Sequence, residues 1–130
     1  MIVIDASALV ELLLQMPAAD HVEQRIFAAN EMLHAPHLLD IEVAQVVRRF
    51  ASRGDISAAT GRAALADLAD LRVYRHRHVS LWPRVWELRN NMTAYDAVYV
   101  VLAEVLGAPL LTRDGRLAAA AGHRAQIELV

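Results

Sequence analysis

The sequence of 130 residues contains no cysteine and no lysine. The lack of cysteine excludes disulfide scaffolds, thiolate zinc sites and cysteine nucleophiles. The lack of lysine excludes every lysine-based mechanism and leaves arginine at all 13 basic positions. Enzymes that need a thiolate or an amine nucleophile are therefore ruled out.

A long apolar run is also missing. The most apolar stretch, residues 97–105, is interrupted by Glu104 and is far shorter than the roughly 20 residues that a membrane span needs. The first segment, MIVIDASALVELLL, has no basic residue and carries Asp5 and Glu11, so it is unlike a secretory signal. We therefore expect a cytoplasmic protein with no membrane contact.

The net charge is only −2, which argues against a general polyanion binder. What the chain does have is a hydrophobic fraction of 56% against a charged fraction of 22%, which is enough to form a buried core. Domains of roughly 100–150 residues are the commonest size. We predict one domain that spans residues 1–130.

Short apolar runs alternate with helical patterns along the chain. Strands are predicted at residues 2–4, 32–35, 109–112 and 127–130, with residues 72–78 as a further extended segment. Helices are predicted from residue 6 to before Pro17 and at residues 18–29, 38–52, 57–71, 80–90, 94–106 and 114–121, with Ser80 as the N-cap of the helix that has Pro83 in its first turn. The strands are apolar throughout, which indicates the α/β class with a mainly parallel sheet covered on both faces.

Two acids follow predicted strands directly. Asp5 ends the first strand, and Asp114 comes just after the strand at residues 109–112. Ligands of parallel α/β sheets bind beyond the carboxyl ends of the strands, so both carboxylates point to a site at that edge. The alternative for each is an N-cap, since aspartate between a strand and a helix stabilises the first helical turn.

Two further acids lie on apolar helices. The helix at residues 94–106 is apolar on nearly all sides, which marks it as buried, and an ionised Asp96 there costs several kcal/mol unless it is paired or binds a cation. Hydrogen bonds from Tyr95 or Tyr99 are the alternative, and Thr93 with Asp96 also resembles a capping box. Asp96 is thus a candidate ligand on a central helix.

Glu42 shares one helical face with Leu38, Leu39 and Val46, so it also points toward apolar neighbours. Its alternative is a salt bridge to Arg48 or Arg49 in the same helix, or to an arginine elsewhere. Asp40 lies on another face and is expected to be solvated.

If several of these acids converge, their repulsion must be relieved by protonation or by a divalent cation. Oxygen ligands alone select Mg²⁺ or Mn²⁺. Such ions serve phosphate chemistry, where they activate a water and steady charge on the attacking and leaving oxygens. The residues alone therefore lead to an acid cluster, a metal and phosphoryl transfer.

Three stretches of the sequence carry a resemblance to a known family. They are IVIDASALVELL with Asp5, APHLLDIEVAQVVRR with Glu42, and LRNNMTAYDAVYVVLAEVLGAPLLTRDGRLA with Asp96 and Asp114. In order and spacing they resemble the motifs of PIN-domain nucleases, and among these the VapC toxins of bacterial type II toxin–antitoxin systems.

The resemblance implies an α/β/α sandwich and an endoribonuclease that depends on Mg²⁺ or Mn²⁺ and cleaves phosphodiesters with metal-activated water. It implies Asp5 and Asp96 as the primary metal ligands, with Glu42 and Asp114 completing the cluster. Small hydroxyl residues near the site correspond to Ser7 and Thr112. It also implies an RNA substrate, a homodimer and a VapB-like antitoxin that inserts an arginine or blocks the site.

The remaining candidates have weaker signals. Arg113 and Arg116 lie beside the proposed site and are candidate RNA contacts, whereas the arginines of the helix at residues 38–52 suit its C-terminus. Trp82 and Trp86 are expected in the core or a dimer interface. Two alternatives to the metal enzyme stay open, namely a catalytically silent PIN-like module that binds RNA or protein, and a metal-free ribonuclease with His76 and His78 as acid and base.

Overall fold

The structure is a computed structural model that describes residues 1–28 and 30–130. The strands of the described chain are β1 (Ile2–Ile4), β2 (Leu33–Pro36), β3 (Val73–His76), β4 (Leu110–Thr112) and β5 (Ile127–Leu129). The helices are α1 (Ala6–Leu13), α2 (Ala19–Phe27), α3 (Leu38–Ser52), α4 (Ala58–Asp70), α5 (Trp82–Glu87), α6 (Ala94–Leu106) and α7 (Gly115–Ala119), with a 3₁₀ turn at Val79–Leu81. The predicted end of the second helix, at residue 29, lies outside the described residues.

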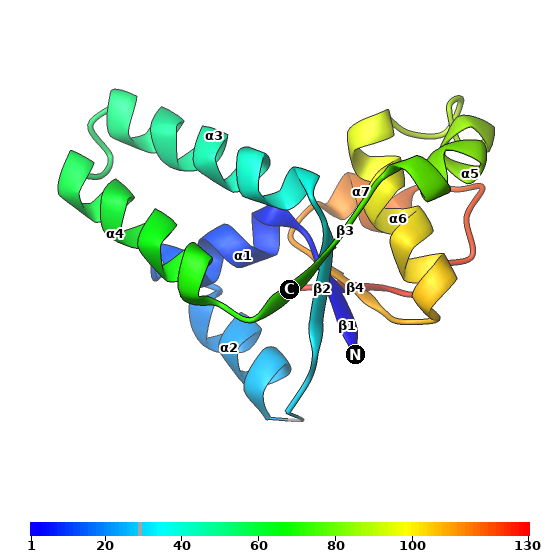
Figure 1. Cartoon of the computed structure of the whole chain (residues 1–130). Helices are drawn as coiled ribbons and strands as arrows, with labels where there is room; N and C mark the ends of the chain where they lie inside the picture. The colour runs from blue at the N-terminus through cyan, green and yellow to red at the C-terminus, as the bar shows by residue number, and fades with distance from the viewer. Residues whose placement is uncertain (29) are drawn as a thin grey trace.

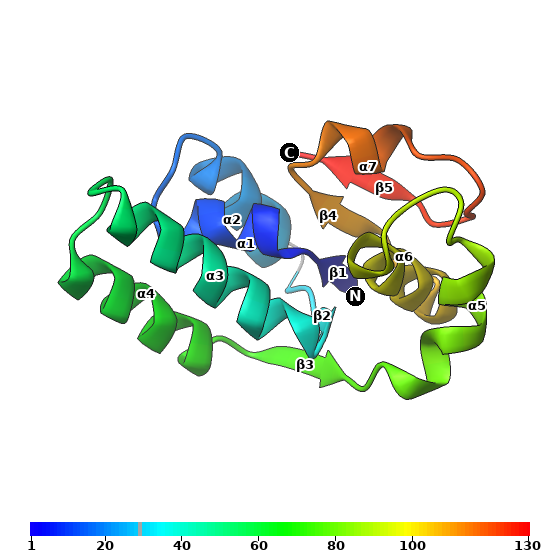
Figure 2. The ribbon, with the colours of Figure 1, turned by 90° about the horizontal axis from the view of Figure 1, so that it is seen from above.

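The five strands form one sheet in the order β3-β2-β1-β4-β5, and every neighbouring pair is parallel. Helices α1 to α4 lie on one side of this sheet and α5 and α6 on the other (Figures 1 and 2). This arrangement confirms the predicted α/β architecture with a parallel sheet between helical layers.

The sheet is held by apolar side chains on both faces. All three residues of β1 are fully buried, as are Leu110 and Leu111 of β4. Helix α6 is buried along most of its length, from Ala97 to Ala103, and it packs on β1, β2 and β4. Each large aliphatic side chain buried in this way stabilises the fold by about 1.5–3 kcal/mol, which explains why β1 and the middle of α6 are apolar.

The strand order reverses direction at β1. The chain moves outward from β1 through β2 to β3, then returns to place β4 on the other side of β1. At such a switch point the loops that leave the carboxyl ends of two adjacent strands diverge and open a crevice. The loops after β1 and β4 carry Asp5 and Asp114, so the topology brings these two acids to the same edge.

Local signals mark several helix boundaries. Ser57 accepts a hydrogen bond from the Thr60 amide at 3.0 Å at the start of α4, and Thr93 accepts one from the Asp96 amide at 3.2 Å at the start of α6. Gly107 ends α6 with a φ of 59°, in the left-handed region that a glycine adopts without strain. The predicted bounds of α3 are confirmed without change.

The prediction for residues 80–90 was wrong in detail. Ser80 is not an N-cap, because it lies inside the 3₁₀ turn, where the Leu81 amide bonds the His78 carbonyl. Helix α5 begins only at Trp82 and ends at Glu87. Proline at the second position of a helix lacks an amide hydrogen that would have no helical partner there, so Pro83 fits this later start.

Candidate active site: a carboxylate pocket at the edge of the sheet

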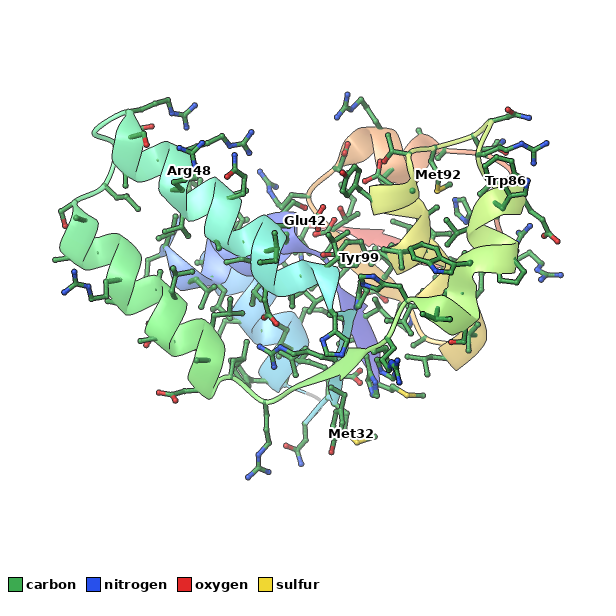
Figure 3. The ribbon with its side chains drawn as sticks, turned by 45° about the horizontal axis from the view of Figure 1, so that its top comes forward. Met32, Glu42, Arg48, Trp86, Met92 and Tyr99 are labelled. Atoms are coloured by element: carbon green, nitrogen blue, oxygen red, sulfur yellow. The ribbon has the colours of Figure 1, made fainter. Side chains whose placement is uncertain are left out.

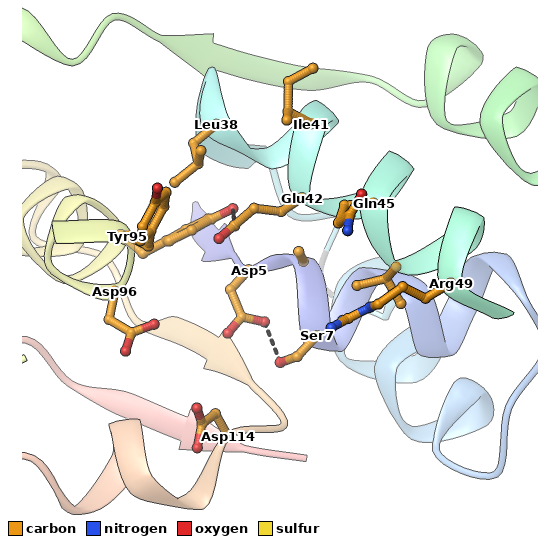
Figure 4. A pocket seen from close by; sticks show the side chains of 13 residues that line it. Asp5, Ser7, Leu38, Ile41, Glu42, Gln45, Arg49, Tyr95, Asp96 and Asp114 are labelled. Atoms are coloured by element: carbon orange, nitrogen blue, oxygen red, sulfur yellow. Dashed lines mark hydrogen bonds between the residues drawn. The ribbon is translucent and has the colours of Figure 1, made fainter. Parts of the chain in front are cut away.

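A pocket of about 410 Å³ opens at the carboxyl edge of β1 and β4. Figure 4 shows four acids around it, each from a different part of the chain. They are Asp5 after β1, Glu42 on α3, Asp96 on α6 and Asp114 before α7. The remaining lining residues are Ala6, Ser7, Leu38, Ile41, Gln45, Val46, Arg49, Tyr95 and Tyr99. The structure therefore brings all four predicted acids to one pocket.

Asp5 is both a helix cap and a wall of the pocket. Its Oδ1 accepts hydrogen bonds from the Ala8 amide at 3.0 Å and from the Ser7 hydroxyl at 2.7 Å, which is the N-cap arrangement. The carboxylate is nevertheless only 7% exposed and has no basic partner among the described residues. Burial raises the pKa of Asp5, against the opposing effect of its hydrogen bonds from Thr112, Ala8 and Ser7.

Thr112 and Ser7 form a small hydroxyl network around Asp5. The Thr112 hydroxyl donates to Asp5 Oδ2 at 2.5 Å and accepts from the Asp114 amide at 2.9 Å. Ser7 Oγ lies 3.3 Å from Thr112 Oγ1 and accepts from the Arg113 amide at 2.9 Å. Because each hydroxyl has several fixed partners, the network holds the Asp5 carboxylate in one orientation.

Glu42 is hydrogen-bonded by a tyrosine that the sequence offered only as an alternative partner of Asp96. The Tyr99 hydroxyl donates to Glu42 Oε2 at 2.5 Å, and the two side chains face one another between α3 and α6 (Figure 3). Among residues 1–28 and 30–130, Glu42 forms no ion pair with Arg48, Arg49 or an arginine elsewhere, so the salt-bridge alternative is wrong. The alternative for Asp96, a hydrogen bond from Tyr99, is wrong, because Tyr99 bonds Glu42 instead. Tyr99 lies one turn after Asp96 on α6, and the close approach of α3 decides which acid it meets.

Asp96 lies in the first turn of α6, with its carboxylate directed into the pocket (Figure 4). Burial raises the pKa of Asp96, and the neighbouring charge of Asp114 raises it further. Burial also raises the pKa of Glu42, with smaller contributions from the charges of Asp5 and Asp96. These acids repel one another through the pocket.

Asp114 is the N-cap of α7 and accepts from the Arg116 amide at 2.8 Å and the Leu117 amide at 3.4 Å. Burial opposes its ionisation, but the Arg116 backbone amide and side chain and the Leu117 amide together hold its pKa below the ordinary value. Asp114 therefore differs from Asp5, Glu42 and Asp96, whose pKa values are raised.

Asp5, Glu42 and Asp96 are buried or half-buried, have raised pKa values and form no ion pair among the described residues. Carboxylates in such surroundings fit a divalent cation. In the described part of the chain, no three acids or histidines already converge closely enough to hold an ion. Without a cation, Asp5 is held by hydroxyls and Glu42 by a phenol. The donor set, made of oxygen atoms only, suits Mg²⁺ or Mn²⁺.

The two predicted RNA-contact arginines differ in their surroundings. The Arg113 guanidinium lies 3.4 Å from Glu11 and bonds the Val130 carbonyl, and Arg113 is not among the residues that line the carboxylate pocket. Arg116 is 94% exposed at its side chain and lies 3.5 Å from Asp114. It lines a second hollow of about 220 Å³ that shares Asp96 and Asp114 with the carboxylate pocket.

Other side chains depart from the sequence-based expectations. Asp40 is not simply solvated, because Arg75 of β3 binds both of its oxygens at 2.8 and 2.9 Å. Trp82 and Trp86 are 46% and 68% exposed and so lie outside the core. A place for them in a dimer interface stays a prediction.

His76 and His78, the proposed acid and base of a metal-free ribonuclease, do not pair with each other. His76 Nε2 lies 2.9 Å from His34 Nδ1, and His78 Nε2 accepts from the Leu38 amide at 3.1 Å. Neither ring is among the residues that line the carboxylate pocket. These contacts remove the support for a histidine-based ribonuclease.

No helix in residues 1–28 or 30–130 is both long and apolar enough to cross a membrane.

Comparison with known proteins gives a consistent picture. The PIN domain matches residues 2–123. Ribonuclease VapC9 of Mycobacterium tuberculosis is 48% identical over 117 residues, which are 90% of this chain and 88% of that protein. Ribonuclease VapC12 of the same organism is 44% identical over 130 residues, 100% of this chain and 99% of that protein.

Solved structures agree in fold. PAE2754 from Pyrobaculum aerophilum superposes with a TM-score of 0.70 at 28% identity, covering 97% of this chain and 81% of that one. A structure of VapBC2 from Rickettsia felis, bound to a DNA fragment of its promoter, gives a TM-score of 0.63 at 13% identity over 99% of this chain and 98% of that one.

Proposed function

Because this chain belongs to the PIN-domain family, among the VapC ribonucleases, we propose that it is an endoribonuclease toxin that depends on a divalent metal ion. The observation that carries the proposal is the pocket that Asp5, Glu42, Asp96 and Asp114 line together. Four acids from four separate elements are costly to bring together, and an ion that they hold together compensates for that cost.

Asp5 and Asp96 are the proposed primary ligands, with Glu42 and Asp114 as supporting ones. When it is bound there, Mg²⁺ or Mn²⁺ supplies Lewis-acid chemistry, which favours deprotonation of water and offsets negative charge on a phosphodiester. Ser7 and Thr112 hold Asp5 in place, and Tyr99 holds Glu42. Partners of this kind keep ligands oriented and raise affinity for an ion.

The protein also shapes the surroundings of the reaction. Leu38, Ile41, Val46 and Tyr95 line the pocket beside the acids, and apolar walls strengthen electrostatic interactions by excluding water. Arg116 stands in solvent next to Asp114, where its guanidinium is free to reach a phosphate of the RNA. The proposed substrate is therefore a single-stranded or looped RNA whose backbone can enter the pocket.

Partners follow from the family and remain proposals. The structural neighbour VapBC2 supports a VapB-like antitoxin as a partner, and we propose that this antitoxin blocks the pocket. A homodimer is proposed because two-fold assemblies dominate soluble homo-oligomers, and the cytoplasm is proposed as the compartment that contains the RNA.

The decisive experiment is RNA cleavage by the purified protein with Mn²⁺ and with excess EDTA. We expect cleavage only with the metal, and no cleavage by Asp96→Asn. Asp67→Asn, which removes an exposed acid of α4, is the matched control and should cleave like the wild type. Cleavage that persists in EDTA would remove the metal from the proposal, and a stable protein that cuts no RNA would favour the silent binding module.

A further inference from the structure

We propose that Arg49 binds a backbone phosphate of the RNA next to the phosphate that is cut. This inference rests on the proposed ribonuclease function and adds the residue that positions the strand. It assigns to Arg49 a binding role in place of the stabilisation of a helix C-terminus.

Arg49 is the one basic side chain among the thirteen residues that line the carboxylate pocket. Figure 4 shows it extending from α3 along the pocket in the direction of Ser7, beside rather than among the four acids. The side chain belongs to an exposed residue, so a ligand in the pocket can reach the guanidinium from solvent.

The position of Arg49 follows from the helical repeat of α3. Glu42, Gln45 and Arg49 lie three and four residues apart, so they share one face of the helix, and all three line the pocket. Seven residues of α-helix separate Glu42 from Arg49 by about 10 Å along the axis. No ion pair between Arg49 and Glu42 is found among the described residues, and the Arg49 guanidinium flanks the place where a strand would cross the acids.

Neighbouring arginines on α3 and near the pocket have other partners. Arg48 bonds Gln45 Oε1 at 3.1 Å, Arg53 pairs with Asp55 at 3.1 Å, and Arg113 pairs with Glu11 at 3.4 Å. For Arg49, no side-chain hydrogen bond or ion pair is found within residues 1–28 and 30–130. Its five guanidinium donors are thus available to a ligand.

The chemistry of the guanidinium selects phosphate. Its planar fork binds two phosphate oxygens at once, which fixes orientation as well as adding affinity. A pocket with four acids repels a polyanion, and one cation at its edge offsets part of that repulsion. Arg49 lines the carboxylate pocket and Arg116 the adjoining hollow, and the two hollows share Asp96 and Asp114. An RNA strand that touches both would pass over Asp96 and Asp114.

The test compares Arg49→Gln with Arg48→Gln, which removes an adjacent arginine of the same helix that does not line the pocket. With Mn²⁺ and an RNA oligonucleotide that the wild type cuts, Arg49→Gln should raise KM about tenfold, as expected for one charged hydrogen-bonded contact, with kcat changed by less than about twofold. Arg48→Gln should change neither. Equal melting temperatures of both variants and the wild type establish that the fold is intact.

Binding of a fluorescent single-stranded RNA in EDTA gives a second measurement that needs no cleavage. Loss of one phosphate contact should make the slope of log affinity against log salt shallower by about 0.7 in Arg49→Gln. Arg49→Lys should restore this slope, because it keeps the charge, while recovering only part of the affinity, because it loses the fork.

The two proposals fail separately. If Arg49→Gln matches Arg48→Gln in KM and in salt slope, the inference about Arg49 is overturned, while cleavage by the wild type still supports the ribonuclease. If the wild type cuts no RNA but Arg49→Gln weakens RNA binding, the ribonuclease proposal fails and the phosphate contact stands.

Discussion

The hydroxyl of Thr112, at the end of β4, donates to Oδ2 of Asp5, at the end of β1, across 2.5 Å. The same hydroxyl oxygen accepts the Asp114 amide at 2.9 Å. One fully buried side chain therefore links two of the four acids, and it does so at the boundary between two neighbouring strands. A hydroxyl that donates to one acid and accepts from the backbone of another couples their positions.

Thr112→Val keeps the shape of the side chain and removes the hydroxyl. We expect the free energy of unfolding to fall by about 1–3 kcal/mol, because the Asp114 amide and the Asp5 carboxylate lose a buried partner. The apparent affinity for Mn²⁺ should fall about 10–100-fold, measured as the metal concentration needed for a given thermal shift. Thr112→Ser retains the hydroxyl and should bind Mn²⁺ nearly as the wild type; equal losses in both variants would contradict the role of the hydroxyl.

The variant Asp5→Asn distinguishes the role of Asp5 as a metal ligand from its role as a helix cap. Asparagine caps a helix about as well as aspartate, and its carbonyl can still accept from the Ala8 amide. We expect no loss of stability in EDTA. With Mn²⁺ at a hundredfold excess over its Kd, the wild type should gain about 2.7 kcal/mol and the variant much less, as measured by thermal melts. Equal gains in the two proteins would show that Asp5 is not a ligand.

Asp96→Asn should stabilise the protein in EDTA at neutral pH. Burial and the charge of Asp114 raise the pKa of Asp96 in the folded state above its ordinary value of 3.8. A raised pKa means that folded stability is lost as pH rises through that pKa, and asparagine does not titrate. The difference in melting temperature between the variant and the wild type should therefore shrink toward pH 3.8. Lower stability of the variant at pH 7 would contradict this account.

The same substitution should lower RNA cleavage with Mn²⁺ at least about a hundredfold, because losing a ligand costs more than losing one of the groups that orient ligands. The initial rate of cleavage measures this loss.

We expect His34 to make the folded protein less stable in mild acid. Burial lowers the pKa of His34 below its ordinary value of 6.5, and the charge of His76 lowers it further. The stability that the neutral ring supports is present above pH 6.5 and is lost as pH falls through the folded-state pKa. Melting temperatures of His34→Gln between pH 8 and pH 5 should fall less than those of the wild type. His21→Gln, at an exposed position of α2, serves as the control and should follow the wild-type curve.

Local chemistry made much of the fold predictable. A short β-branched run followed by an acid identified β1 and its end at Asp5. Thr93 and Gly107 mark the two ends of α6 through interactions within a few residues of the chain. Such signals depend on neighbours in sequence. That Asp5 and Asp114 lie at the same edge followed from the rule that parallel strands share their carboxyl edge, whereas the strand order was seen only in the structure.

Contacts between distant segments were not predictable in the same way. Tyr99 and Glu42 are 57 residues apart, and Asp40 and Arg75 are 35 apart. Which tyrosine meets which acid depends on how closely α3 approaches α6, and this is set by the packing of both helices on the sheet. The sequence indicates that such polar groups need partners, but the partner itself is decided by tertiary structure.

The sheet order determines how late in translation the pocket can form. Asp5 and Thr112 are 107 residues apart, so a ribosome adding 5–20 residues each second needs roughly 5–20 s to pass from one to the other. Throughout that interval the growing chain carries Asp5 without β4, and for most of it without α6. The four acids can therefore line one pocket only after β4 and Asp114 have been synthesised, so the nascent chain has no complete acid cluster throughout that interval.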